Sequence, residues 1–169
     1  MNPIILLGST RSFGHTRQAV SDIIGDETIP IIELRNLTIA PYEYEHPHLD
    51  DDFIPTIETL ITHDLLIIAT PVYWYSMSTL HKIFFDRFND LLTVRKDLGR
   101  KLRGKKLFVI ASFGTSYPKG FEETFEQICD YLGMHYLGTS FMYSGFEDLE
   151  LLANNAHHKA QARKILNLR

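Results

Sequence analysis

The feature that most constrains this chain is an alternation of short apolar runs with segments of helical period. Four runs of strand length cover 4–7, 28–34, 65–70 and 107–112, and a fifth at 136–143 mixes Gly and hydroxyl residues into an aromatic stretch. Segments with helical spacing of apolar residues follow them at 16–24, 55–62, 78–92, 121–132 and 151–166. The pattern predicts a parallel sheet covered by helices on both faces.

The order of these elements limits how the sheet can be wound. Five consecutive strand–helix units with right-handed crossovers predict an α/β/α sandwich with a five-stranded parallel sheet in the order 2-1-3-4-5, as a single domain over 1–169. Pro55 suits a first helical turn and Gly133 suits a helix C-cap. Ligands of such sheets bind at the carboxyl ends of the strands, beside the first and third. Three loops therefore become candidates, at 8–15, 71–77 and 113–119.

Composition narrows the classes of function. A chain of 169 residues, 44% of them hydrophobic, can bury one sizeable core, and a net charge of -4 gives no basic surface for nucleic acid. Its single cysteine, Cys129, can form neither an internal disulfide nor a multi-cysteine metal site. No basic leader precedes the first strand, and no apolar run reaches the length of a membrane span. We expect a cytoplasmic protein that acts on small molecules, without nucleic-acid or membrane partners.

The segment after the first predicted strand, GSTRSFGHT at 8–16, leads directly into a predicted helix. Unpaired backbone N–H groups and the helix dipole converge at such a start, which favours an anion. Ser9, Ser12 and Thr16 add hydroxyl donors, and Arg11 adds a planar charged fork. The loop lacks the Walker lysine and the G-x-G-x-x-G spacing, so it favours a terminal monophosphate. The alternative is a loop that only caps the helix, because Ser and Thr are common N-caps.

Three aromatic residues follow the third predicted strand. Tyr73, Trp74 and Tyr75 stand together where exposed rings are costly unless they cover a partner, and a planar apolar ligand would be the natural one. The residues at 76–78 then bring backbone N–H groups near the start of the next helix, where they can meet the edge of a bound ring. The alternative is that Trp74 and Tyr73 close the core or bury a subunit interface.

Both loops together resemble those of the NAD(P)H-dependent FMN reductase and quinone reductase family of flavodoxin-like flavoproteins. The matching segments are GSTRSFGHT and, from residue 70, TPVYWYSMSTLHKIFFDR, and the strand–helix units extend the resemblance over nearly the whole chain. The resemblance implies a flavodoxin-like fold, bound FMN, NADPH or NADH as electron donor, and a homodimer whose neighbouring subunit helps to complete the flavin pocket.

The resemblance also assigns roles to individual residues. It implies that the first loop holds the FMN phosphate through Ser9, Arg11, Ser12, His15 and Thr16. It implies that the second loop wraps the isoalloxazine and ribityl through Pro71, Val72, Tyr73, Trp74, Tyr75, Ser76 and Met77. Gly114 in the third loop is expected near the ring, although relatives are glycine-richer there and often have Asn in place of His15. Lys82, Asp86 and Arg87 are expected to serve structure or subunit packing.

A flavin would supply the redox chemistry, so no catalytic side chain is expected. Backbone N–H groups of Ser76, Met77 and Gly114 are candidates for stabilising negative charge on a reduced ring. The expected activity is electron transfer from a reduced nicotinamide to a quinone, a flavin or a similar small acceptor. The alternatives are a flavodoxin-type electron carrier without a nicotinamide site, against which the modest net charge of -4 argues, and a binding module without turnover.

Three further patterns have simpler explanations. His46 and His48 lie among five carboxylates between Glu43 and Asp52, where an exposed acidic loop is favoured over a metal site. Seven of the 17 basic residues fall in 95–106, which indicates a solvated link before the fourth strand more than a site for a phosphate-bearing substrate. The G-x-S pattern at 114–116 is followed by Pro118 instead of Gly, which argues against a serine hydrolase.

Overall fold

The computed structural model describes residues 1–168 and has five parallel strands in one sheet. The strands are β1 (Pro3–Leu7), β2 (Ile31–Glu33), β3 (Leu65–Pro71), β4 (Lys106–Phe113) and β5 (His135–Tyr143). Their order is β2-β1-β3-β4-β5, which confirms the predicted winding and the flavodoxin-like fold. No helix among the described residues is both long and apolar enough to cross a bilayer.

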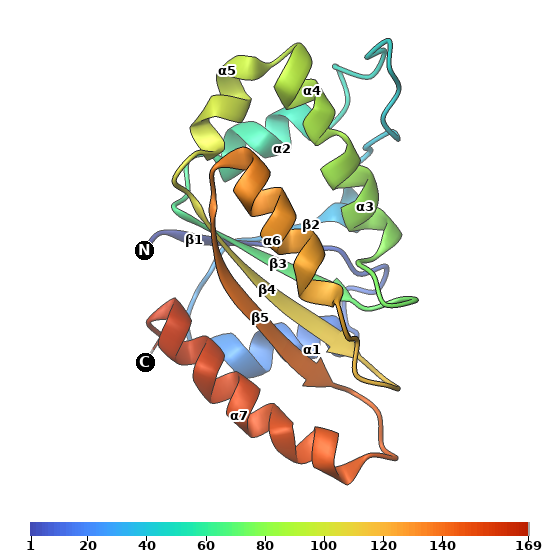
Figure 1. The fold of residues 1–169 in the computed structure, drawn as a ribbon, viewed down its shortest axis with the longest axis vertical. Helices are drawn as coiled ribbons and strands as arrows, with labels where there is room; N and C mark the ends of the chain where they lie inside the picture. The colour runs from blue at the N-terminus through green and yellow to red at the C-terminus, as the bar shows by residue number, and fades with distance from the viewer. Residues whose placement is uncertain (169) are drawn as a thin grey trace.

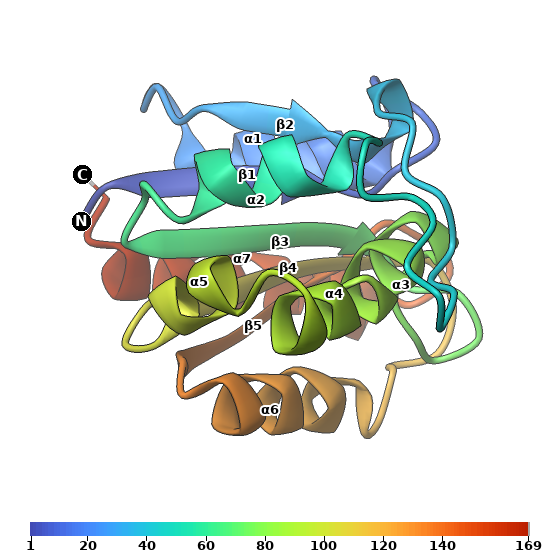
Figure 2. The same ribbon diagram turned by 90° about the horizontal axis from the view of Figure 1, so that it is seen from above.

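Helices cover both faces of the sheet, as Figures 1 and 2 show. One face carries α1 (His15–Ile24) and α7 (Leu149–Leu166), and the other carries α2 (Phe53–Leu60), α3 (Thr79–Asp86), α4 (Phe88–Thr93), α5 (Lys96–Gly99) and α6 (Phe121–Leu132). Two short 3-10 helices, η1 (Leu34–Asn36) and η2 (Arg100–Leu102), complete the elements. Alternate residues of β1 face opposite layers: Ile4 and Leu6 join the core under α2–α6, whereas Ile5 and Leu7 join the core under α1 and α7.

Two predicted elements differ from the observed ones. The strand predicted over 28–34 is shorter, because Pro30 has no N–H to continue the ladder and the chain turns into η1 after Glu33. The helix predicted over 78–92 ends at Asp86 and restarts at Phe88, with Arg87 at the junction. Gly133 caps α6 in the left-handed region, at φ 68°, as predicted.

Arg87 explains why the long helix is broken. Its side chain is almost fully buried and forms ion pairs with Asp51 and Asp90, while its guanidinium also donates to the carbonyls of Ala40 and His48. The acidic loop predicted after the second strand is therefore anchored at Asp51 and His48 to the α3–α4 junction. This agrees with the structural role that the resemblance implied for Arg87.

The basic segment at 95–106 is more structured than the predicted solvated link. It forms α5 and η2, which bury Leu98 and Leu102 in the core while Lys96, Arg100 and Arg103 stay exposed. Its leucines four residues apart place one apolar face against the sheet, so the charges mark the other face of a short helical turn.

Candidate functional site

A cleft lies at the carboxyl ends of β1, β3 and β4, where the three predicted loops meet. The part beside the 8–16 loop has a volume of about 320 Å³, and an adjoining part of about 260 Å³ shares Val72, Phe113 and Gly114 with it. Eight predicted site residues line the first part: Ser9, Arg11, His15, Thr16, Pro71, Val72, Tyr73 and Gly114. Trp74 and Tyr75 line the second part. Ser12, Ser76 and Met77 line neither.

The N-terminus of α1 opens into this cleft without a capping side chain. Gly14 occupies the N-cap position, no side chain accepts from the first-turn N–H groups, and the first turn holds no acidic residue. Side chains cap α3 through Ser78 and α7 through Asp148, whereas α2, α4, α5 and α6 also start without one, so what distinguishes the start of α1 is that it faces the cleft. Gly14, His15 and Thr16 all line the cleft. The geometry therefore argues against the alternative of a loop that only caps its helix, and leaves the free donors available to an anion.

Arg11 and Arg17 have different roles although they lie close in sequence. Arg17 pairs with Glu33 at 3.3 Å, whereas none of the ion pairs found within 1–168 involves Arg11. Arg11 is exposed and lines the cleft, and its backbone N–H donates to Ser9 Oγ at 3.2 Å. The free guanidinium at the mouth of the cleft suits a phosphate.

Ser12 does not reach the cleft, although the sequence assigned it to the phosphate. Its hydroxyl donates to Glu33 Oε2 at 2.7 Å and accepts from Arg35 Nη1 at 2.7 Å. Glu33 is the last residue of β2 and Arg35 lies in η1, so the pairing links two segments distant in sequence. Ser12 thus links the 8–16 loop to the end of β2 and to η1 instead of lining the cleft.

The 71–78 loop forms a tight turn at the cleft. Tyr73 and Ser76 exchange two backbone hydrogen bonds of 3.0 Å, and the two residues between them are left-handed, with φ 51° at Trp74 and 62° at Tyr75. Such angles are rare for bulky residues and mark stored strain that functional loops often hold. The Ser76 N–H is used by the turn, so it is engaged before any ligand arrives.

The aromatic residues of this turn point outward. Trp74 is 95% exposed and Tyr73 and Tyr75 are more than half exposed, so the alternative that Trp74 or Tyr73 closes the core is wrong for the single chain. Tyr75 Oη lies 3.2 Å from Ser116 Oγ and joins this turn to the loop after β4. Met77 is buried in the core under α2–α6 and supports the turn from below.

Several cleft residues were not named individually from the sequence, although 113–119 was one of the three candidate loops. They include Ser112 and Phe113 at the end of β4, Thr115 and Ser116 beyond it, and Ser144 after β5. A Cβ placed on Gly114 would meet only Ser144 Oγ, at 3.8 Å, so the backbone there is open to a close approach by a ring. The rule that ligands sit at strand ends could have added Ser144, because β5 ends beside β4.

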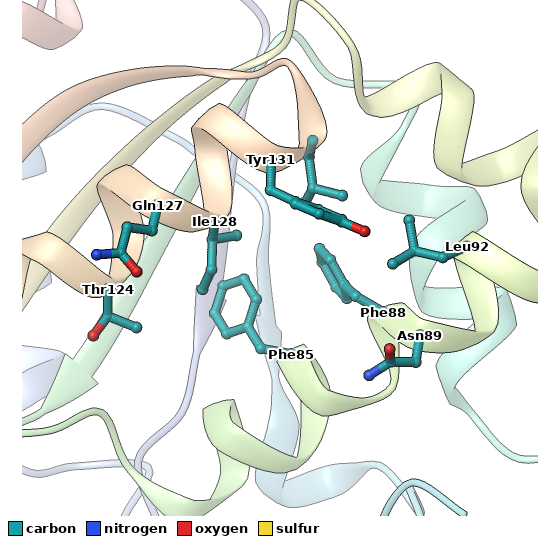
Figure 3. A pocket seen from close by; sticks show the side chains of 9 residues that line it. Phe85, Phe88, Asn89, Leu92, Thr124, Gln127, Ile128 and Tyr131 are labelled. Carbon is teal, nitrogen blue, oxygen red and sulfur yellow. The ribbon is translucent and has the colours of Figure 1, made fainter. Parts of the chain in front are cut away.

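A second cavity of about 420 Å³ lies away from the strand ends, between α3–α4 and α6. Figure 3 shows Thr124 and Gln127 at one end and Tyr131 and Leu92 at the other, with the ring of Phe85 between them. Its wall is mostly apolar and lacks the converging donors of the cleft. The thiol of Cys129 does not contribute to either cavity, and burial raises its pKa to about 12.

Known proteins share both the sequence pattern and the fold. The sequence profile of the family described as "Flavodoxin-like fold" matches residues 9–166. A curated relative from Bacillus subtilis (strain 168), YwqN, is 30% identical over 149 residues, which cover 82% of this chain and 82% of the relative. Its name describes an NAD(P)H-dependent FMN-containing oxidoreductase.

Two solved structures illustrate the shared fold. The Trp repressor binding protein from Bacillus subtilis superposes with a TM-score of 0.75 at 23% identity, over 97% of this chain and 96% of that one. An FMN-dependent NADH-azoreductase from Bacillus anthracis str. Ames Ancestor, solved in complex with FMN, gives a TM-score of 0.68 at 11% identity, over 98% of both chains. At these identities the superpositions establish the architecture alone.

Proposed function

Because the chain belongs to the flavodoxin-like fold family, we propose that it is an FMN-containing oxidoreductase that transfers electrons from NADPH or NADH to a small acceptor such as a quinone or a flavin. The observation that carries the proposal is the uncapped N-terminus of α1 opening into a cleft that continues to an aromatic turn. The two parts fit a molecule with a phosphate at one end and a planar ring at the other.

The residues of the cleft fit FMN in both chemistry and position. The first-turn N–H groups of α1 and the guanidinium of Arg11 would bind the phosphate dianion, and Thr16, Ser9 and His15 would add contacts around it. The backbone of 71–73 and the open backbone at Gly114 would hold the ring between them, with Trp74 and Tyr75 at its rim. Bound FMN would supply hydride acceptance and electron donation, so the chain needs no acid, base or nucleophile of its own.

The chain's own contribution would be orientation and electrostatics. The backbone N–H groups of the 113–116 segment, together with those N–H groups of the 71–78 loop that its own hydrogen bonds leave free, would favour the negative charge that develops on a reduced ring. The Tyr75–Ser116 contact would hold these two segments at a fixed separation around it. The aromatic side chains at the rim would exclude water from one edge of the flavin ring, while one face of the ring would stay open to a nicotinamide.

A second copy of the chain would complete the rim of the cleft. Phe13 is 94% exposed and Phe146 is 87% exposed, and both lie on loops at the same end of the sheet as Trp74. Several large exposed apolar rings at one end of a molecule favour an interaction surface, so we propose a homodimer formed through this end of the sheet. Replacing Phe146 with Ser should convert the dimer to a monomer in sedimentation equilibrium, and a wild-type monomer at every concentration would refute the homodimer.

The proposed compartment is the cytoplasm. The only cysteine is a buried free thiol, which a reducing compartment would preserve. Fractionation of the source cells with an antibody against the protein tests this assignment, and recovery outside the cytoplasmic fraction would refute it.

Two measurements test the proposed activity. Anaerobic addition of NADPH or NADH to the flavin-loaded protein should bleach the visible flavin absorbance, and a quinone should restore it. Bleaching by dithionite but by neither nicotinamide would instead support an electron carrier.

A matched pair of arginine variants tests the cofactor site. Arg11→Ala should weaken FMN more than riboflavin, by the 1.5–3 kcal/mol typical of a charge-assisted hydrogen bond, or about 10- to 150-fold. Arg17→Ala, which loses only its pair with Glu33, should leave the preference for FMN unchanged. Equal affinities of the wild-type protein for FMN and riboflavin would refute the phosphate site.

A further inference from the structure

His81 is a fully buried imidazole in the first turn of α3, beneath the start of the phosphate loop. Its exposed fraction is 0%, and burial lowers its pKa to about 4, so it is neutral near pH 7. Its Nε2 lies 3.2 Å from the carbonyl of Leu6, near the end of β1. Because a carbonyl only accepts, Nε2 carries the proton and donates to Leu6.

The same ring touches the first residue of the phosphate loop. A Cβ placed on Gly8 would lie 2.1 Å from His81 Nδ1 and 2.3 Å from its Cε1, so the imidazole fills the space directly against the Gly8 backbone. Gly8 N–H donates to the Ala69 carbonyl at 2.9 Å, which fixes this residue to β3 as well. The imidazole therefore supports the point at which β1 ends and the loop begins.

The other side of the imidazole meets the end of the second cleft loop. Its Nδ1 faces Ser78 Oγ at 3.5 Å, and Ser78 caps α3 by accepting from His81 N–H at 3.3 Å. Ser78 N–H in turn donates to Thr70 Oγ1 at 3.0 Å. One buried side chain thus contacts both the start of the loop that faces the phosphate and the end of the loop that faces the ring.

We propose that His81 is a positioning residue that sets the separation between the phosphate loop and the 71–78 loop, and thereby the protein's preference for a phosphorylated flavin. It touches no substrate or cofactor and acts through Leu6, Gly8 and Ser78. The proposal rests on the proposed FMN site, and it adds the side chain that fixes the distance between the phosphate-binding and ring-binding loops of that site.

The competing explanation is that His81 only fills the core. If His81 only fills the core, an apolar side chain of similar volume can replace it, and any loss of affinity should be equal for every ligand. If His81 positions the loops, only a side chain that still donates to the Leu6 carbonyl can replace it. Its loss should then weaken binding of the flavin phosphate more than binding of the flavin ring.

The test compares His81→Leu, His81→Met and His81→Gln with Phe85→Leu as a control. Phe85 is a buried neighbour on the same helix, with its ring centroid 6.4 Å from that of His81. Apoprotein of each variant is titrated with FMN and with riboflavin, and the ratio of the two dissociation constants is the readout. Circular dichroism of the bound flavin reports the orientation of the ring.

We expect the apolar variants to reduce the preference for FMN over riboflavin by about tenfold, the effect of one lost or misplaced hydrogen bond. His81→Gln should keep the preference within about threefold of wild type, because its amide can donate to Leu6. Phe85→Leu should change both affinities together and leave the ratio unchanged.

The remaining outcomes overturn the proposal in distinguishable ways. An unchanged ratio in folded His81→Leu or His81→Met, with a wild-type protein that prefers FMN, would overturn the role of His81 alone. A wild-type protein without any preference would remove the phosphate site and this proposal together. Folding of His81→Gln with failure of both apolar variants to fold would make His81 a determinant of the fold and overturn its positioning role.

Discussion

Thr16 and Ser112 join the first helix to the fourth strand, with their hydroxyl oxygens 2.7 Å apart in the lining of the cleft. Both side chains are almost fully buried, and both line the cleft. The pair links the N-terminal turn of α1, which is the proposed phosphate site, to the end of β4, which leads to Gly114. The sequence pointed to Thr16 but not to its partner.

Replacing Thr16 with Val should destabilise the apoprotein by about 1–3 kcal/mol, because the Ser112 hydroxyl would then be buried without its partner. The double variant Thr16→Val/Ser112→Ala should recover most of that loss, since neither side chain then has an unsatisfied group. Urea unfolding of the single and double variants measures both effects. Additive losses in the double variant would contradict the pairing.

Arg87 should be among the most sensitive positions outside the cleft. Arg87→Leu leaves Asp90 and Asp51 without their cation, and breaking a buried ion pair from one side typically costs about 3–5 kcal/mol. The expected result is a lower urea midpoint and faster proteolysis within 41–52, the loop that Arg87 anchors.

Arg95→Leu is the matched control for Arg87. Its pairs with Glu58 and Asp97 lie at the surface, so its loss should change the urea midpoint much less. Burial alone would raise the pKa of Asp51, yet hydrogen bonds from Arg87 and from backbone N–H groups hold it below its ordinary value. Equal effects of the two arginine variants would show that the buried cluster is not a stabilising anchor.

Much of the architecture could be predicted because local sequence patterns determine its strands and helices. The apolar runs that became β1, β3 and β4 are buried on both faces, and Gly133 sits where a helix must turn left-handed before a strand. The position of the cleft followed from the strand order alone. These features depend on neighbours in sequence or on a topological rule.

What the sequence did not reveal depends on partners distant along the chain. The apolar period runs without interruption through Arg87, and the break in the helix coincides with the ion pairs of Arg87 with Asp90 and with Asp51, 36 residues away. Ser12 has the residue type of a phosphate ligand, but its hydroxyl donates a hydrogen bond to Glu33, 21 residues away. No local pattern distinguishes a serine that faces a cleft from one that faces a carboxylate.

His81 should make folding stability depend on pH. Burial lowers its pKa to about 4 in the folded chain, against 6.5 for an exposed histidine, so between these values the unfolded chain binds more protons. Stability is therefore lost as pH falls from about 6.5 to about 4, by up to roughly 3 kcal/mol.

A comparison with His81→Gln isolates this contribution, because burial also lowers the pKa of His158 and acts in the same direction. The difference in unfolding free energy between wild type and variant should change across this interval and level off above pH 7. A difference that is constant from pH 4 to pH 7 would show that His81 does not titrate this way.

Trp74 gives the most direct test of the ring site. It is the only tryptophan in the chain, it lines the cleft, and it is 95% exposed. Binding of FMN should therefore quench the tryptophan fluorescence. Trp74→Ala should raise the FMN dissociation constant about two- to tenfold, because an aromatic stack adds about 0.5–1.5 kcal/mol, and Trp74→Phe should restore most of the affinity.

The proposed homodimer and the proposed flavin site could each involve Trp74, and sedimentation equilibrium distinguishes the two roles. Weaker FMN binding by an intact Trp74→Ala dimer would assign the indole to the cofactor. Dissociation of that variant with unchanged affinity per folded chain would assign the indole to the subunit interface. Because the left-handed φ of 51° is strained for Trp and equally strained for Phe, the Phe variant keeps the turn under the same constraint. Any recovery in Trp74→Phe therefore reports the aromatic ring itself, and absent quenching with unaltered affinity in Trp74→Ala would remove Trp74 from the flavin site.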